Sequence, residues 1–341
     1  MRVAIVGTEL CALDQRGGGL ERVVLRWGEA LAAAGHEVVR LSYAPAGPPL
    51  GDVITVERPA DLGRALRRAA PDLVSLHNRP QWGRLCPPGA RVAVTFHNFP
   101  RAWRVRAPSW AAVRAAAPTF RVSAVSSALA AAAADALGVP RRDVAVTAPS
   151  IDPTFVCPPP RAPEAVVLSP NRLLRKKGVL DLLAVARRPG LREIEFAFAD
   201  LLSPWAAPTA EHRALRAAVA RVPNASLFAP AATPAELAAR YAIAGVVACP
   251  AREPEGLGLV PLEAQACGAP VVTTDVGGLR EATFPPNRCI PPGDRDALMT
   301  ALIDALSTSA PQLDARRAVL AQHSPNAAGA TFLRWVAEAV P

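Results

Sequence analysis

Two carboxylates lie in a glycine-containing stretch between Cys249 and Pro270, where a predicted strand is followed by a predicted helix. Glu255 directly precedes Gly256–Gly258, and Glu263 follows Glu255 by eight residues. Glycines at a strand–helix junction let backbone N–H groups approach a ligand, and a helix N-terminus favours an anion. Either glutamate alone would be read as a surface acid. The whole stretch instead predicts a site that holds two parts of one long polar ligand.

A basic motif, Asn171–Gly178, directly follows another predicted strand. Arg172 and Lys177 stand five residues apart, and Lys176 and Lys177 are the only lysines among 38 basic residues. The planar fork of an arginine and the compact charge of a lysine together suit a diphosphate. The alternative that remains open is a solvated basic loop.

The glycine cluster Gly17–Gly19 opens the first predicted helix. It lies about ten residues beyond the first strand and does not have the G-x-G-x-x-G pattern. The second predicted strand, which ends near Leu41 and Ser42, lacks the acidic residue that binds a ribose in dinucleotide sites. These two absences argue against a nicotinamide-dependent dehydrogenase.

Two histidine–asparagine pairs follow predicted strands: His77 with Asn78, and His97 with Asn98. Doubly wound α/β domains bind ligands at the ends of strands. A single histidine there is more often structural. Two at equivalent positions favour a ligand contact by one of them, and we take His77, Asn78 and Asn98 as acceptor-side candidates.

Asp294 and Asp296 form a D-x-D pattern like that of metal-dependent sugar transferases. The pattern follows Pro-Pro-Gly and precedes a predicted helix, so Asp294 is expected to cap that helix. We predict no metal at this position and no cofactor elsewhere.

Short β-branched runs alternate with alanine- and leucine-rich helical patterns along the whole chain, which predicts parallel sheets built from βαβ units. The proline-rich segment Asp152–Glu164 interrupts this alternation, and we interpret it as a linker. The expected organisation is an N-terminal α/β domain over 1–152, a C-terminal α/β domain over 165–325, and a helix over 326–341 that returns to the first domain. Strands are expected at 2–6, 37–41, 73–76, 92–96, 122–125, 144–147, 166–169, 195–199, 226–228, 245–249 and 270–273, and helices at 19–34, 127–137, 179–186, 234–243, 259–266, 296–306 and 326–339.

Composition limits the class of protein. The 341 residues suit two domains, and no apolar run reaches the roughly 20 residues of a membrane helix. The N-terminus lacks a signal-peptide pattern, so we expect a cytoplasmic protein with six reduced cysteines. The net charge of +9 is spread along the chain without a dense basic run, which argues against a nucleic-acid partner.

Taken together, these motifs resemble the family-4 retaining glycosyltransferases of the GT-B fold, in which two doubly wound parallel-sheet domains face a central cleft. The resemblance covers nearly the whole chain and is most specific at Glu255–Pro270, which is similar to the family's E-x7-E segment. The family's other motif positions occur in order at Gly18, Gly19, His97, Ser126, Arg172, Lys177 and Gly178.

The resemblance implies that Gly18 and Gly19 approach the phosphates of a nucleotide-sugar donor with their backbone. It implies that His97 contacts the transferred sugar near the reacting carbon. Arg172 and Lys177 are implied to neutralise the departing diphosphate in place of a metal ion.

In the E-x7-E segment, the resemblance implies that Glu255 orients the hydroxyl groups of the sugar. The backbone amides of Gly256, Leu257 and Gly258 are implied to hold the sugar and the phosphate. Glu263 is implied to bind the hydroxyl groups of the ribose.

The chain departs from the family pattern in three places. Pro149–Asp152 replaces the usual Asn-Gly before a hydrophobic–Asp pair, and Asn171 replaces a glycine. Ala199–Pro204 replaces a glycine-containing loop that approaches the nucleotide, so the identity of the base stays open.

The expected activity is transfer of a hexosyl group, with retention, from a nucleotide-diphosphate sugar (a UDP-sugar is favoured) to a small-molecule or lipid acceptor. The short chain and the Pro-Ser-Ile-Asp variant resemble bacterial transferases of antibiotic or aminocyclitol pathways. The alternatives are a nucleotide-sugar epimerase or phosphorylase of the same fold, or a non-catalytic nucleotide-binding protein. The arginine-containing segment Val105–Phe120 is expected to be a helix with one buried face, and an acceptor, a partner or a peripheral membrane contact there stays open.

Overall fold

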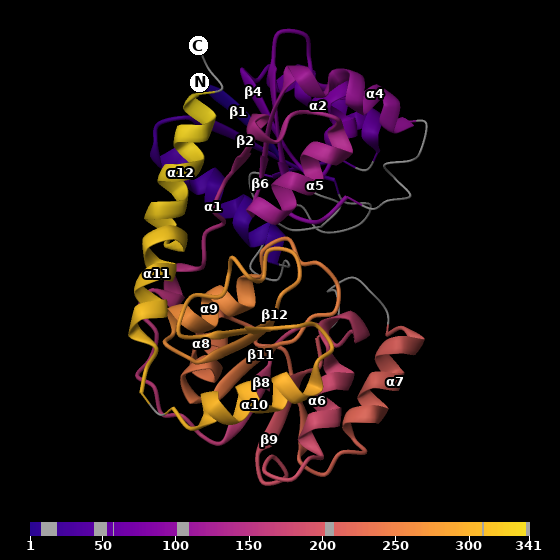
Figure 1. The fold of residues 1–341 in the computed structure, drawn as a ribbon. Coiled ribbons are helices and arrows are strands. Elements are labelled where there is room, and N and C mark those ends of the chain that lie inside the picture. Colours follow the sequence, from indigo (N-terminus) through magenta and orange to yellow (C-terminus); the bar gives the residue numbers. More distant parts are fainter. Residues whose placement is uncertain are drawn as a thin grey trace. The chain divides into compact units, whose positions relative to one another are not determined.

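The computed structural model describes residues 1–7, 19–43, 53–56, 58–100, 109–201, 208–308 and 310–338. The chain packs into two compact units. The first comprises Met1–Ser150 together with Pro325–Pro341, and the second comprises Ile151–Ser324. Each unit is a parallel β-sheet with helices on both faces (Figure 1).

The first unit contains a seven-stranded sheet in the order β3-β2-β1-β4-β5-β6-β7. All its neighbouring strands pair in parallel. The central strands are buried on both sides because helices cover both faces, which is why they consist of β-branched and other apolar residues. Its strands are β1 (Arg2–Val6), β2 (Glu37–Tyr43), β3 (Val53–Val56), β4 (Leu73–His77), β5 (Arg91–Phe96), β6 (Phe120–Ala124) and β7 (Val144–Val146).

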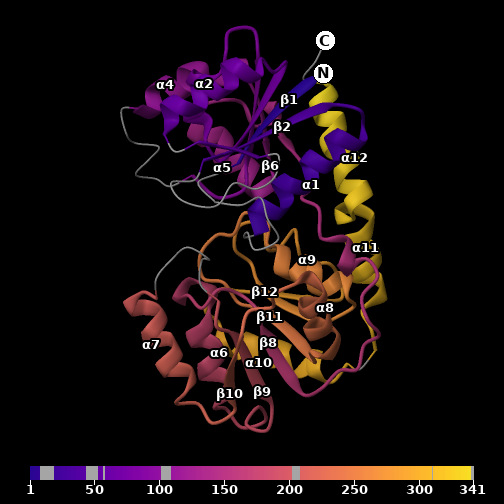
Figure 2. The same ribbon diagram turned by 180° about the vertical axis from the view of Figure 1, so that it is seen from behind.

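The helices of the first unit are α1 (Gly19–Ala33), α2 (Pro59–Ala69), α4 (Ser109–Ala116), α5 (Ser127–Leu137) and α12 (Pro325–Ala337). The chain's last helix, α12, lies alongside α1, as both views of the ribbon show (Figures 1 and 2). The rings of Phe332 and Trp27 stack there with centroids 4.4 Å apart and planes 1° apart. Both side chains are completely buried, so this stack is part of the core of the first unit.

The second unit contains a six-stranded parallel sheet in the order β10-β9-β8-β11-β12-β13. Helices α6, α7 and α10 pack on one face, and α8, α9 and α11 pack on the other (Figure 1). Its strands are β8 (Val166–Ser169), β9 (Glu195–Ala199), β10 (Ala225–Phe228), β11 (Val246–Cys249), β12 (Val271–Thr274) and β13 (Arg288–Ile290). Its helices are α6 (Val179–Ala186), α7 (Ala210–Val219), α8 (Pro234–Ile243), α9 (Leu259–Ala266), α10 (Arg295–Leu306) and α11 (Leu313–His323).

The proline-rich segment after Ser150 belongs to the second unit, where its end is hydrogen-bonded to the C-terminus of α8. The backbone amides of Ala162 and Glu164 donate to the carbonyls of Ala242 and Ile243. Nη1 of Arg161 donates to the carbonyl of Tyr241 at 3.0 Å. The segment therefore supplies donors to helix-end carbonyls that have no partner within the helix.

Every strand and helix expected at the ranges given above is present, with ends that differ by at most two residues. The helix expected within Val105–Phe120 ends earlier, since α4 ends at Ala116 and Phe120 begins β6. The prediction missed β3, β13, α2, α7 and α11. The missed strand β13 (Arg-Cys-Ile) contains only one β-branched residue, and the missed helix α2 is rich in arginine, whereas β3 was missed although all four of its residues are β-branched. In Val105–Phe120, the described helix α4 has the predicted buried face: Trp110 is 7% exposed, and its Nε1 donates to the carbonyl of Ala136 at 2.8 Å.

The strand order of each sheet reverses at one point. In the first unit the chain runs outward from β1 to β3 and then returns to place β4 on the other side of β1. In the second unit β11 returns to the side of β8 in the same way. Such switch points open a crevice at the carboxyl ends of the two central strands, where ligands bind. In the second unit, these two strands are β8 and β11, and the loops that follow them contain the motifs Asn171–Gly178 and Glu255–Gly258.

No helix within the described ranges is both long enough and apolar enough to cross a membrane.

Candidate functional site

The loops that follow β8 and β11 lie against each other in the second unit. The first loop ends in a short 3₁₀ turn, Arg175–Lys177, and in Gly178, whose φ is +77°. A Cβ atom on Gly178 would lie 1.9 Å from the carbonyl oxygen of Pro250, so only glycine allows this approach. The backbone amide of Arg252 also donates to the carbonyl of Lys176 at 2.8 Å. The two loops therefore form one continuous surface.

The loop that contains Glu255 packs against the loop that follows β12. Glu255 pairs with Gly277 in an isolated parallel bridge, and the amide of Gly278 donates to the carbonyl of Glu255 at 2.8 Å. A Cβ atom on Gly278 would lie 2.2 Å from the carbonyl oxygen of Gly256. This close backbone packing fixes the position of Glu255 relative to the end of the sheet.

Lys177 and Glu255 form an ion pair across the two loops. Nζ of Lys177 lies 2.5 Å from Oε1 of Glu255, and the two side chains are 14% and 22% exposed. The sequence assigned Lys177 to a diphosphate and Glu255 to a sugar. The two side chains neutralise each other, and both remain partly accessible from solvent.

The thiol of Cys249, at the end of β11, lies among the predicted donor residues. Burial raises the pKa of this thiol to about 12, the Nδ2 atom of Asn171 hydrogen-bonds to its sulfur, and the charges of Lys177, Glu255 and Glu263 all act on it. The distance from Nδ2 of Asn171 to Sγ is 3.4 Å. The thiol is therefore neutral.

Glu263 lies on α9, in the second turn after the loop. It is 1% exposed, and its Oε2 accepts a hydrogen bond from the hydroxyl of Tyr241 at 3.1 Å. A buried carboxylate requires hydrogen-bond donors, and the tyrosine supplies one of them. Tyr241 was not identified from the sequence, because a single tyrosine on a helix has no distinguishing pattern.

The side chain of Arg172 is exposed, and it has no acidic partner among the residues that the structure describes. Leu257 is 5% exposed and Gly256 is buried, while Gly258 caps the N-terminus of α9. The predicted donor residues of the second unit therefore lie on the two loops at its switch point and on the helix that follows.

A buried acid, Asp181, anchors the loop before Glu255. Its carboxylate accepts hydrogen bonds from Nε of Arg252 at 2.6 Å and from Nε of Arg295 at 2.9 Å. Burial raises the pKa of this carboxyl, but the two guanidinium groups outweigh burial and leave the pKa below its usual value. Asp181 thus ties the β11 loop to α6 and α10. The cluster was not predicted from the sequence, because Arg252 and Arg295 lie far from Asp181 along the chain.

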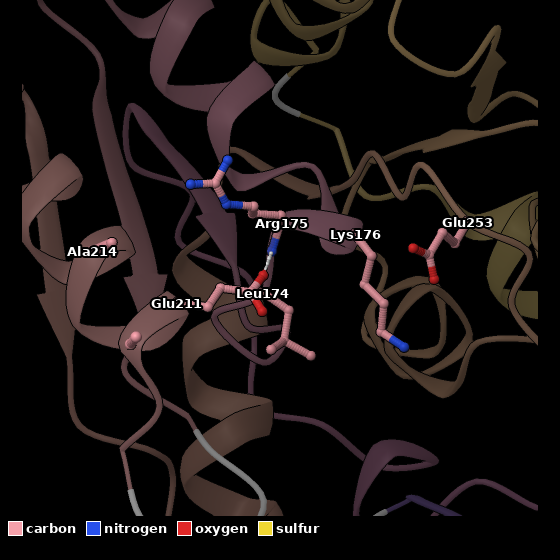
Figure 3. A pocket seen from close by; sticks show the side chains of 7 residues that line it. Leu174, Arg175, Lys176, Glu211, Ala214 and Glu253 are labelled. Carbon is pink, nitrogen blue, oxygen red and sulfur yellow. Dashed lines mark hydrogen bonds between the residues drawn. The ribbon is translucent and has the colours of Figure 1, made fainter.

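An open hollow of about 820 Å³ adjoins the same two loops. Figure 3 shows the side chains of Lys176 and Glu253 in this hollow and the hydrogen bond from the backbone amide of Arg175 to Glu211. The two lysines that the sequence singled out therefore have different surroundings. Lys177 pairs with Glu255, whereas Lys176 lines the hollow beside the loop.

In the first unit, the two predicted histidines contact each other at the ends of β4 and β5. His77 is opposite Thr95 in the strand pairing, and its Nδ1 lies 3.1 Å from Nε2 of His97. His77 is completely buried, and burial lowers its pKa to about 3. Burial, together with the charge of His77, lowers the pKa of His97 well below its usual value. Both rings are therefore neutral near pH 7, and His77 contacts His97 rather than solvent.

Asn78 holds the chain at His97 and Asn98. Its Oδ1 accepts from the backbone amides of these two residues at 2.7 and 3.2 Å. Asn78 has a φ of +57°, a left-handed conformation that asparagine tolerates better than most residues. The side chain of Asn98 is exposed. Of the predicted glycines, Gly19 begins α1, and Gly18 lies outside the described residues.

Asp294 caps α10, as its pattern predicted. Its side chain accepts from the backbone amides of Asp296 and Ala297. The carboxylate of Asp296 instead pairs with Arg188. Over the described ranges, no cluster of three or more histidine, cysteine, aspartate or glutamate residues is arranged to hold a metal ion.

Both units match known protein families. Residues 158–321 match the family of glycosyl transferases group 1, and residues 17–155 match glycosyltransferase family 4. A stretch of 55 residues is 56% identical to the D-inositol 3-phosphate glycosyltransferase of Pseudarthrobacter chlorophenolicus. That match covers 16% of this chain and 13% of the relative's length.

Solved structures share the arrangement over almost the full chain. A glycosyltransferase from Rickettsia africae is similar over 99% of this chain and 98% of its own, with a TM-score of 0.77 and 18% identity. The Anabaena protein Alr3699/HepE, in complex with UDP-glucose, is similar over 99% of this chain and 100% of its own, with a TM-score of 0.74 and 16% identity. At these identities the similarity establishes the fold.

The fold of the chain is that of the GT-B class, and each of its two units matches a family of glycosyltransferases. Within that class, the first unit matches family 4 and the second unit matches group 1.

Proposed function

We propose that this protein transfers a hexosyl group from UDP-hexose to a hydroxyl group of a small-molecule or lipid acceptor, with retention of the anomeric configuration. The observation that supports this proposal is the ion pair of Lys177 and Glu255 across the two loops at the β8/β11 switch point, with Glu263 on the helix that follows the second loop. In this proposal, the cation of Lys177 binds the diphosphate, and the two carboxylates accept hydrogen bonds from sugar hydroxyls.

In this proposal, Lys177 and the exposed Arg172 bind the diphosphate. Because Lys177 already lies 2.5 Å from Glu255, a diphosphate that binds Lys177 brings the attached sugar next to that carboxylate. Glu255 accepts hydrogen bonds from the sugar hydroxyls and stabilises positive charge on the ring, an interaction that strengthens towards the transition state. Glu263 accepts hydrogen bonds from the ribose.

The remaining proposed contacts come from backbone amides and from the first unit. The amides of Gly256–Gly258 precede α9, where the helix dipole favours an anion. Gly19, at the start of α1, approaches the donor phosphates with its backbone. His97 contacts the transferred sugar as a neutral ring, because its pKa is well below the usual value. It therefore acts by hydrogen bonding rather than by charge.

The proposed reaction needs no metal ion and no protein base. The acceptor oxygen attacks the anomeric carbon on the face from which the diphosphate departs, as the bond from that carbon to the diphosphate oxygen breaks. The acceptor proton passes to the departing phosphate oxygen. Lys177 and Arg172 stabilise the negative charge of the leaving group in place of a metal.

For the acceptor, we propose a cyclitol or a related polyol, as in an antibiotic or aminocyclitol precursor. The partial match to D-inositol 3-phosphate glycosyltransferases supports a cyclitol. UDP as the donor nucleotide is supported by Alr3699/HepE, which was determined in complex with UDP-glucose.

The test is incubation of the protein with UDP-glucose and a panel of cyclitols and other polyols in the presence of EDTA. We expect UDP release that depends on an acceptor, and proton NMR should show an α-linked product from the α-linked donor. A β-linked product would refute retention. UDP release with free sugar and no acceptor indicates an epimerase, and strict dependence on inorganic phosphate indicates a phosphorylase.

A further inference from the structure

The phenol of Tyr241 is directed at the carboxylate of Glu263 inside the second unit. Tyr241 lies on α8 and Glu263 on α9, and the hydroxyl of Tyr241 donates to Oε2 of Glu263 at 3.1 Å. The two side chains are 0% and 1% exposed. Water therefore does not compete for this hydrogen bond, which increases its influence on the carboxylate.

The ring of Tyr241 is itself held in place. Its centroid lies 5.9 Å from that of Phe155, which is also completely buried. The backbone carbonyl of Tyr241 accepts from Nη1 of Arg161, and the carbonyl of Ala244 accepts from Nη2 of the same side chain, both at 3.0 Å. The phenol is thus a rigid donor whose direction is set by the packing of the second unit.

A hydrogen bond to one carboxylate oxygen restricts rotation of the carboxylate plane. The position of Oε2 against Tyr241 therefore also sets the direction of Oε1. Two adjacent hydroxyl groups, as in a ribose, bind a carboxylate well only when its plane is aligned with both. Glu263 lies on α9, whose N-terminus directly follows Glu255 and Gly256–Gly258, so Glu263 borders the proposed donor site.

We infer that Tyr241 is a positioning residue that orients Glu263 for the 2′- and 3′-hydroxyl groups of the donor's ribose. Through Glu263 it sets the preference of the enzyme for ribonucleotides over 2′-deoxyribonucleotides. This inference rests on the proposed function, in which Glu263 binds the ribose. Tyr241 touches no substrate atom.

The test compares Tyr241→Phe with the unchanged protein by calorimetry, using UDP and 2′-deoxy-UDP as the two probes. We expect the unchanged protein to prefer UDP by roughly tenfold or more, the effect of one hydrogen bond to a charged group. Tyr241→Phe should reduce this preference by roughly threefold to tenfold, because the carboxylate of Glu263 loses the hydrogen bond that orients it, while affinity for 2′-deoxy-UDP stays nearly constant. With UDP-glucose, KM should rise and kcat should stay within about twofold.

The control is Ser226→Ala, which removes another hydroxyl-to-carboxylate hydrogen bond of the same unit, from Ser226 to Oε1 of Glu195 at 2.6 Å. It should leave the ratio of the two affinities unchanged. An equal loss of affinity for both nucleotides in Tyr241→Phe would mean general destabilisation and would overturn the inference.

Glu263→Gln separates the inference from the proposed function. If Glu263→Gln abolishes the preference and Tyr241→Phe leaves it intact, the positioning role is wrong and the ribose site stands. If the unchanged protein shows no preference at all, the ribose role of Glu263 fails, and the role of Tyr241 fails with it.

Discussion

Nζ of Lys177 lies 2.5 Å from Oε1 of Glu255, although 78 residues separate them in the chain. The pair joins the two loops at the switch point of the second unit and neutralises a cation and a carboxylate that would otherwise be unpaired at the edge of the sheet. A diphosphate competes with Glu255 for Lys177. Donor binding is therefore expected to exchange one ion pair for another, and to leave Glu255 beside the sugar.

Lys177→Ala should reduce affinity for UDP by roughly tenfold to 150-fold, because a hydrogen bond to a charged group contributes about 1.5–3 kcal/mol. The loss also leaves Glu255 without its cation near the phosphates. Arg175→Ala is the matched control, since Arg175 belongs to the same turn and its backbone amide, rather than its guanidinium, bonds to Glu211. Calorimetry with UDP compares the two variants, and equal losses would indicate only a general electrostatic effect.

Glu255→Gln should reduce kcat by roughly 100-fold while the affinity for UDP changes by less than about threefold. The physical reason is that Glu255 faces charge that develops on the sugar, whereas UDP lacks the sugar. Glu263→Gln should weaken UDP binding at least as strongly as it lowers kcat. Steady-state kinetics combined with calorimetry measures both ratios. A Glu255→Gln variant that loses donor affinity without losing turnover contradicts the assignment.

Gly178→Ala should abolish measurable donor binding while the second unit stays folded. A Cβ atom there meets the carbonyl oxygen of Pro250 at 1.9 Å, so the two loops must move apart and separate Lys177 from Glu255. Gly190→Ala is the control, because Gly190 also has a positive φ but its nearest neighbour lies at 4.0 Å. Both variants carry the strain of alanine at positive φ, roughly 1–2 kcal/mol. Thermal unfolding and UDP binding of the two variants distinguish strain from loop displacement.

Asn78→Gly should lower the free energy of unfolding of the first unit by about 1–3 kcal/mol, the contribution of two hydrogen bonds to the amides of His97 and Asn98. Glycine tolerates the φ of +57°, so backbone strain does not contribute. Asn78→Asp keeps an acceptor oxygen and should recover part of the loss. Urea unfolding measures the three proteins. An Asp variant as unstable as the Gly variant would show that the acceptor oxygen is not what matters.

The neutral state of His77 should make the first unit less stable in acid. The pKa of His77 is about 3 in the folded chain, against about 6.5 in an unfolded chain. Between these values the unfolded chain binds a proton that the folded chain does not, so stability is complete above pH 6.5 and falls as the pH decreases towards 3. The expected slope for this group is about 1.4 kcal/mol per pH unit.

Two measurements check this. The ring signals of His77 in an NMR titration should show no protonation between pH 7 and pH 5. In His77→Asn, the fall in the free energy of unfolding over the same range should be smaller than in the unchanged protein. A midpoint near 6.5 for the His77 ring would contradict the prediction.

The sequence by itself determined the class of fold and the elements that make its centre. Parallel strands buried on both faces must be apolar and β-branched, and the helices between them must show a 3.6-residue period, so both signals are local. The motifs Asn171–Gly178 and Glu255–Gly258 were also readable, because glycines and charges at strand ends have few other uses. The edge strand β13 was missed, because its residues Arg-Cys-Ile include only one β-branched side chain.

Only the tertiary structure decided which of these residues meet. The pairing of Lys177 with Glu255, the hydrogen bond from Tyr241 to Glu263 and the contact between His77 and His97 each join different elements. The sequence placed each histidine at a strand end, but only the pairing of β4 with β5 brings the two rings together and removes His77 from solvent. Such pairs depend on strand order and close packing, which are properties of the whole unit. A local sequence pattern therefore does not predict which residues form these pairs.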